Sequence, residues 1–273
     1  MKLVRKITNS KLFFTFIWIA ALIIVWEIFA YQVEQTKRTP ENVLPHLSGV
    51  VDSLTSDKKI NGSQTAFQMV MENAGATLSR AAIGYVIGIA LGFILALIMS
   101  LSGIVEKIVF PYLMLIQIIP ILGMAPIINA ITKDIAVSRI VIAAILTFYP
   151  VAANTLAGFK AVRKESHELM YSYSASKFQL YTKMMIPSCI PYFFTGLKIS
   201  APMAITASIL VDTLQGGLGL GCLLSQSLKG AMTRYVFWDI VFFSAIIGIL
   251  SFYFIGIIEK LLCPYKKNEQ KGR

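Results

Sequence analysis

Few side chains in this 273-residue sequence have the type and spacing that catalysis or metal binding requires. The two histidines, His46 and His167, are far apart, and Cys189, Cys222 and Cys263 lack the spacing of a metal-ligand or redox pair. The sequence also has no G-x-x-x-x-G-K-[ST] phosphate-binding loop. We therefore predict no catalytic residue, metal or cofactor in this chain, and no nucleotide hydrolysis by the chain alone. A structural role is expected for each thiol.

A polar stretch from Glu168 to Pro191 lies between long apolar runs. Its helix-forming residues are interrupted by small ones, which predicts two short helices joined by a tight turn. We expect three polar side chains to face outward, namely Glu168, Ser176 and Lys177. Four apolar side chains are expected to pack inward, namely Leu169, Phe178, Leu180 and Met184. Spacing alone fits an ordinary connecting loop and a docking surface equally well.

The elements around this stretch are apolar enough to cross a membrane. Hydrophobic residues make up 56% of the chain and charged residues 14%, whereas soluble domains have about 25% charged residues. Six runs reach the roughly 20 residues that span a bilayer, and they are Leu12–Tyr31, Ala81–Leu101, Ile108–Ile131, Ile140–Phe159, Pro191–Leu210 and Val236–Ile258. Because lipid leaves backbone groups no external partner, these runs predict an all-α protein with six transmembrane helices.

Two of the six runs differ from a plain membrane helix. The third contains Pro111, Pro120 and Pro126 and is predicted to be kinked or partly unwound. The first follows basic residues, as a secretory signal does, but it is too long and lacks a small-x-small exit, so we expect an uncleaved helix. Pro187 and Pro191 place the start of the fifth helix near the end of the polar stretch.

The runs divide the chain into three parts. Residues 1–73 hold an anchor helix and an external segment, with short amphipathic helix expected around Leu44–Leu54 and again from Thr65. Residues 74–262 form the membrane core, with the polar loop at 164–188. Residues 263–273 form a short charged tail.

The basic residues indicate how the chain is oriented. Four of the 25 lysines and arginines precede the first run, five lie in or just before the polar stretch, five lie in the tail and one is Lys107. Eight lie in the opposite loops, Arg139 among them. This bias predicts that both termini and the polar stretch are cytoplasmic. It also explains the net charge of +11 without nucleic-acid binding.

Four charged residues lie in or beside the apolar runs, where charge is costly and often functional. Glu27, Lys198 and Asp239 are expected to pair or to extend toward the interface. Asp212 directly precedes a glycine-rich segment, Gly216–Gly221, and could line the external mouth of a solute pathway. That segment superficially resembles a dinucleotide loop, but it follows a membrane helix and not a strand, so it predicts an external turn or a re-entrant loop.

The polar stretch also resembles a known motif. It is similar to the EAA loop of binding-protein-dependent ABC importer permeases, whose pattern is E-A-A, three residues, G, nine residues and I-x-L-P. The matching positions are Glu168, Ser174, Met184, Ile186 and Pro187. PYFFTGLKIS at 191–200, PILGMAPI at 120–127 and GLGLG at 217–221 extend the resemblance, which is to the branch that handles nitrate, sulfonates, taurine and thiamine precursors.

The match has departures. Leu169 and Met170 replace the two alanines, and Ser174 replaces the glycine. If that turn needs a positive φ, serine costs on the order of 1 kcal/mol there.

The resemblance implies an importer in the bacterial inner membrane. Such an importer has two membrane subunits, usually identical, two cytoplasmic ATPase subunits that bind the ATP, and an extracellular or periplasmic solute-binding protein. The loop would insert into a groove of the ATPase. Glu168 would support it, Ser174 and Ala175 would allow close approach beside Ser176 and Lys177, and Pro187 would set the exit toward the fifth helix. The resemblance does not identify the solute.

Two other classes of function fit the sequence less well. An ion-coupled secondary transporter is expected to show repeated halves, and we see no internal repeat. An intramembrane enzyme would need a constellation of histidine, acidic or cysteine residues, which the sequence lacks.

Overall fold

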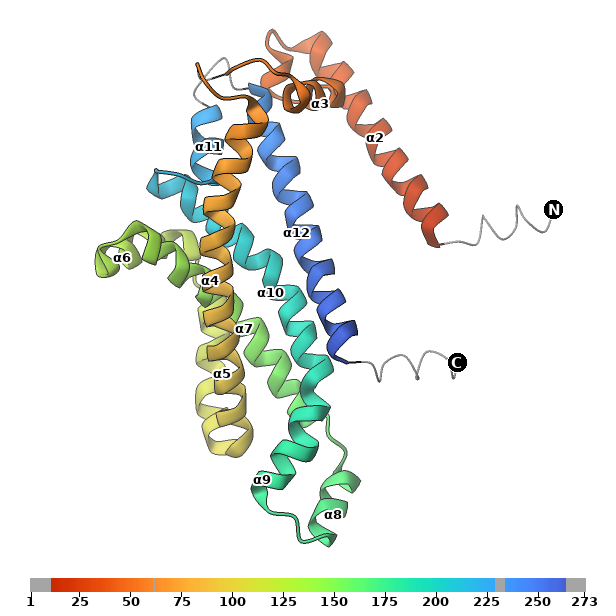
Figure 1. Ribbon diagram of the computed structural model, residues 1–273, viewed down its shortest axis with the longest axis vertical. Helices are drawn as coiled ribbons and strands as arrows, with labels where there is room; N and C mark the ends of the chain where they lie inside the picture. The colour runs from red at the N-terminus through yellow and green to blue at the C-terminus, as the bar shows by residue number, and fades with distance from the viewer. Residues whose placement is uncertain (1–10, 61, 229–233, 264–273) are drawn as a thin grey trace, which may run out of the picture. The chain divides into compact units, whose positions relative to one another are not determined.

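A computed structural model describes residues 11–60, 62–228 and 234–263 (Figure 1). Most of the predicted tail, residues 264–273, and the basic residues Lys2, Arg5 and Lys6 lie outside this range. The described residues form helices, with a single isolated β-bridge between Lys59 and Thr65. The elements in order are α2 (Lys11–Thr36), η1 (Pro40–Asn42), α3 (Leu47–Thr55), α4 (Ala66–Leu101), α5 (Gly103–Ile118), α6 (Ile121–Thr132), α7 (Ile135–Lys160), α8 (Lys164–Ser172), α9 (Lys177–Leu180), the π-helical segment η2 (Tyr181–Met185), α10 (Ile186–Gln215), α11 (Leu220–Ser227) and α12 (Arg234–Leu262).

Among the described residues, five helices are long and apolar enough to span a membrane. The number of spans is six when the bent pair α5 and α6 is counted as one span. The axes of that pair differ by 109° at the break before Gly123. Pro120 directly precedes α6, and Pro111 and Pro126 lie inside α5 and α6. The predicted all-α fold and the break in the third run are therefore confirmed.

Two helix boundaries differ from the sequence prediction. Helix α4 begins at Ala66, well before the predicted Ala81, because its first turns are too polar to register as an apolar run. The fifth helix begins at Lys177 and winds through η2 into α10, so Pro187 lies in the first turn of α10 but does not start the helix. A π-turn can absorb such a proline, since it already departs from the α-helical hydrogen-bond pattern.

The described residues fall into two compact units, one of Met1–Val70 with Gln226–Val241, and one of Met71–Ser225 with Phe242–Arg273. In the first unit α3 packs between α2 and the start of α12. Trp26 Nε1 donates to Pro45 O at 3.0 Å, and the indole rings of Trp26 and Trp238 meet edge to face. From residue 13 to residue 26, helix α2 is apolar on all its faces, as a helix surrounded by lipid is.

In the second unit α7 is the central helix, and glycines let α4 approach it closely. A Cβ placed on Gly84, Gly88 or Gly92 of α4 would lie within 2.5–2.7 Å of an α7 atom. This Gly-x-x-x-Gly spacing brings backbones together in membranes, where packing drives association. Gly158 and Gly196 do the same between α7 and α10, where a Cβ would lie 2.8–2.9 Å from the facing helix.

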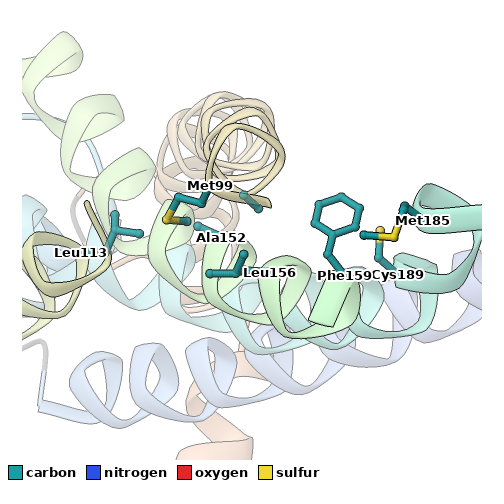
Figure 2. Packing of buried hydrophobic residues seen from close by; sticks show 8 residues of the cluster. Met99, Leu113, Ala152, Leu156, Phe159, Met185 and Cys189 are labelled. Atoms are coloured by element: carbon teal, nitrogen blue, oxygen red, sulfur yellow. The ribbon is translucent and has the colours of Figure 1, made fainter. Parts of the chain in front are cut away.

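A buried apolar cluster joins the ends of these helices next to α9. Figure 2 shows Phe159 of α7 facing Met185 and Cys189, with Leu156 and Met99 farther along. Leu180 and Met184 pack against the same cluster, as predicted. The cluster therefore connects α4, α7 and α10 at the end of the unit from which α8 and α9 extend (Figure 1).

Candidate functional site

The predicted pair of short helices is present as α8 and α9, which extend beyond the ends of α7 and α10 (Figure 1). The turn between them is a Schellman motif, in which Ser174 N donates to Tyr171 O at 2.8 Å and Ala175 N to Met170 O at 3.1 Å. Ser174 has φ 53°, the left-handed conformation that glycine normally supplies at this position. The serine therefore occupies the position where the motif has glycine, and the suspected positive φ is confirmed.

Helix α9 starts with a capping box. Ser176 Oγ accepts a hydrogen bond from Gln179 N, and Gln179 Oε1 accepts one from Ser176 N at 2.9 Å. This satisfies two backbone donors that the start of a helix leaves free. This role of Ser176 was not predicted, although the S-x-x-Q spacing is a known signal for it.

The loop's polar side chains face solvent, as predicted. Glu168, Ser176 and Lys177 are exposed, and the Glu168 carboxylate lies 3.8 Å from Lys164 Nζ in the next turn of α8. The prediction of inward packing is wrong for Leu169 and Phe178, which are 57% and 77% exposed. The reason is that α8 and α9 contain no buried residue and lie past the membrane helices they were expected to cover.

Two tyrosines of the loop, Tyr171 and Tyr173, are exposed as well. We call Leu169, Tyr171, Tyr173 and Phe178 the aromatic face; the tyrosines are 87% and 77% exposed. Large apolar side chains exposed on a short polar loop indicate a contact with a partner or a membrane.

A second site lies around Asp212, which is completely buried. Its Oδ1 lies 3.1 Å from Arg80 Nη2 and 2.9 Å from Arg139 Nε, and its Oδ2 accepts a hydrogen bond from Thr77 Oγ1 at 2.6 Å. These four residues, the Asp212 cluster, come from α4, α7 and α10. Two guanidinium groups thus surround one carboxylate, and a buried charge is tolerated only when it is paired in this way.

The Asp212 cluster also holds the glycine-rich segment. Arg80 Nη2 donates to Leu218 O at 2.8 Å, Arg139 Nη2 donates to Gly216 O, and Leu220 N donates to Thr77 Oγ1 at 2.8 Å. The segment then turns into α11, which folds back on α10 so closely that a Cβ on Gly221 would lie 1.9 Å from Ile209 O. The segment and α11 thus fold back along α10, and the choice between an external turn and a re-entrant loop stays a prediction.

The roles of the two arginines of this cluster were not predicted. Arg139 was assigned to an external loop, but it lies in the first turns of α7 and is 3% exposed. An arginine near the end of an apolar run, with an acid near the end of another, is the signal that could have found the pair. Contact of Asp212 with solute stays a prediction, since in this conformation its carboxylate has no exposed surface.

Of the other three membrane charges, Lys198 and Glu27 belong to ion pairs, and Asp239 is hydrogen-bonded to a serine. Lys198 of α10 forms an ion pair with Glu259 of α12, and Glu27 accepts hydrogen bonds from His46 at 2.6 Å and from Leu47 N at 2.9 Å. Asp239 accepts one from Ser53 Oγ at 2.9 Å. In the part of the chain that the structure describes, no three acidic, histidine or cysteine side chains are grouped so as to hold a metal ion.

Comparison with known proteins agrees with this architecture. Residues 88–262 match the family described as binding-protein-dependent transport system inner membrane component. The formylaminopyrimidine transport permease protein ThiX of Halalkalibacterium halodurans is 30% identical over 91% of this chain and 94% of its own length. The nitrate import permease protein NrtB of Synechocystis sp. is 24% identical over 90% of this chain and 87% of its own.

A solved structure shows the same fold. It is titled as the crystal structure of an amino acid ABC transporter with histidines, and it aligns with 71% of this chain and 92% of its own at a TM-score of 0.57 and 18% identity. The family match covers more than half of the chain and extends over the polar loop, the Asp212 cluster's acid and α12. This chain therefore belongs to the inner-membrane components of binding-protein-dependent transport systems and is a multi-pass permease subunit of an ABC importer.

Proposed function

We propose that α8, the turn at Ser174 and α9 form the surface on which a cytoplasmic ATPase subunit docks. The observation that carries this proposal is the aromatic face: four large apolar side chains that the chain itself leaves uncovered. A permease without an ATP-binding motif must receive its energy from another subunit, so its exposed apolar loop is the natural point of contact.

The loop is built to be rigid before it binds. The Schellman motif closes α8 and the capping box opens α9, so the backbone groups at the turn are already satisfied. A preorganised surface loses less conformational entropy on association. Ser174 and Ala175 keep the tip of the turn small, and Glu168 and Lys177 place opposite charges on its rim.

The same proposal assigns the remaining partners. ATP binds the ATPase, a second and identical permease copy completes the pathway, and an external solute-binding protein delivers the solute. Both termini lie in the cytoplasm with the loop. Relatives are named for formylaminopyrimidine, nitrate and aliphatic sulfonates, so we propose a small polar solute of that kind.

The test is purification of the tagged chain from its native membrane in mild detergent, followed by mass spectrometry of the proteins that stay bound. A Walker-motif ATPase in equal amount is the expected result. The double variant Tyr171→Ser with Tyr173→Ser should lose it, because half of the aromatic face is gone, while Lys58→Ser with Lys59→Ser in the external segment should keep it. An ATPase that stays bound in full to the tyrosine variant would overturn the assignment.

A further inference from the structure

Tyr181 lies where the α8–α9 loop joins the membrane helices. It is the first residue of η2, and its hydroxyl donates to Ser100 O at 2.9 Å. Ser100 is the next-to-last residue of α4. Residues 164–185 are all described, and among their side-chain hydrogen bonds only those between Tyr181 and Ser100 reach a transmembrane helix.

The acceptor on α4 is a group that needs a donor. The last four carbonyl groups of a helix have no partner within it, and α4 ends at Leu101. The chain then turns at Ser102, which caps the start of α5 and does not extend α4. The Tyr181 hydroxyl therefore completes the carboxyl end of α4.

The ring of Tyr181 makes a second connection. It packs against Phe159 of α7, with ring centroids 6.4 Å apart and planes at 64°. Figure 2 shows Phe159 between α7 and the Met185–Cys189 region of η2 and α10. One side chain thus contacts the ends of α4 and α7 from the segment that leads out of the loop.

The backbone at Tyr181 is also unusual. Ile186 N donates to Tyr181 O, a bond across five residues, so the π-turn starts at this residue. π-turns are rare within helices and often occur at functional sites. The hydrogen-bond pattern of the helix therefore changes at the residue that contacts α4 and α7.

Helix α4 carries this connection far from the loop. Thr77 and Arg80, near its other end, belong to the Asp212 cluster and hold the glycine-rich segment. The 23 helical steps from Thr77 to Ser100 span about 35 Å at the rise of an α-helix. A displacement of the α4 end at Ser100 would therefore act on the far cluster through one continuous helix.

We propose that Tyr181 is a positioning residue for energy coupling: its hydroxyl fastens α4 to η2, so that a movement which the ATPase imposes on α8 and α9 reaches α4 as well as α10. This inference rests on the proposed function of the loop. Without the hydroxyl, the loop still docks and still pulls on α10, to which it is covalently joined, but α4 no longer follows.

The experiment uses the permease–ATPase complex in lipid nanodiscs and needs no knowledge of the solute. Hydrogen exchange of the amides is compared with and without ATP and vanadate, in wild type and in Tyr181→Phe, which keeps the ring contact with Phe159. Wild type is expected to show a nucleotide-dependent change in the α8–α9 loop and in the last turns of α4. Tyr181→Phe should keep the first change and lose the second.

Two control variants sharpen the result. Tyr253→Phe removes a hydroxyl from an exposed tyrosine of α12 and should behave as wild type. Ser100→Ala removes only the Ser100 hydroxyl, which lies 3.5 Å from the Tyr181 oxygen, and keeps the carbonyl, so it should also retain the change in α4.

The outcomes separate the two proposals. If wild type binds no ATPase, or the loop shows no nucleotide-dependent change, the docking proposal fails. If the loop responds and Tyr181→Phe keeps the full change in α4, the docking proposal stands and the role of Tyr181 is overturned.

Discussion

Ser174 stores backbone strain at the tip of the α8–α9 loop, because a non-glycine residue there has φ 53°. A left-handed conformation costs a residue with a Cβ about 1–2 kcal/mol, and glycine avoids this cost. We expect Ser174→Gly to raise the thermal unfolding midpoint of the purified complex. The matched variant Ser172→Gly, in the last turn of α8, should lower it because glycine is a poor helix former. A lower midpoint for Ser174→Gly would contradict this account.

Asp212 is predicted to be essential for the folded state. Replacing it with asparagine keeps its shape but leaves the buried Arg139 and the partly buried Arg80 without a counter-charge. Breaking a buried ion pair in this way costs about 3–5 kcal/mol. Thermal unfolding of Asp212→Asn should show a large loss of stability.

The control for Asp212 is Glu106→Gln, which breaks the ion pair with Lys160, whose side chain is 57% exposed. Such surface pairs contribute about 0–1 kcal/mol. If Asp212→Asn folds with normal stability and loses only solute uptake, the carboxylate belongs to the solute pathway and not to the support of the glycine-rich segment.

His46 makes the attachment of α3 to α2 depend on pH. Its hydrogen bond to Glu27, and a weaker contact with Glu34 at 3.4 Å, raise the pKa of His46 above its ordinary value of 6.5. A raised pKa stabilises the folded state fully just below pH 6.5, and this contribution is lost as the pH rises through the folded value. The difference in unfolding midpoint between wild type and His46→Gln should therefore shrink as the pH rises; a difference that grows would contradict the assignment.

At the scale of elements, hydropathy predicted the membrane helices well and their ends poorly. The six apolar runs each correspond to a helix or to the broken pair α5 and α6. The first turns of α4 contain Glu72 and Asn73, and α9 precedes the apolar part of α10, so neither registers as apolar although both are helical. A hydropathy pattern detects contact with lipid, whereas a helix ends only where its hydrogen-bond ladder is interrupted.

The contact between α4 and α7 could have been predicted from the glycines of α4 and was not. Gly88 is the middle one, and a Cβ there would lie 2.5 Å from Thr147 Cβ and 2.7 Å from Ala144 O. Gly88→Ala should therefore separate the two helices and reduce the amount of folded protein, measured by size-exclusion chromatography after heating. Gly75→Ala, also in α4, has nothing within 4 Å of the new Cβ and should be harmless. Equal effects of the two would exclude close packing as the cause.

At the scale of the whole molecule, the sequence predicted the class of protein and the two short helices of the α8–α9 loop but not the Asp212 cluster. Its three charged members are separated by 59 and 73 residues along the chain, and no local pattern reports which helices meet. The loop was predictable because its turn, its cap and its following proline are local signals. The aromatic face was not, since its exposure depends on where the neighbouring helices end.

Orientation in the membrane is the last prediction. Fifteen basic residues lie on the side of the termini and the loop, against eight on the opposite side. This bias favours cytoplasmic termini and a cytoplasmic loop. It also agrees with the need for α8 and α9 to reach the compartment that contains ATP.

Single cysteines and a membrane-impermeant maleimide test this orientation in intact cells. The three native thiols are buried and should give little background. Lys58→Cys in the external segment should be labelled directly, and Ser174→Cys only after permeabilisation, because the bilayer separates the two positions. Epitope tags on either terminus should likewise be detected only after permeabilisation. Labelling of Ser174→Cys in sealed cells would place the aromatic face outside, where no ATPase could dock, and would overturn both the orientation and the docking proposal.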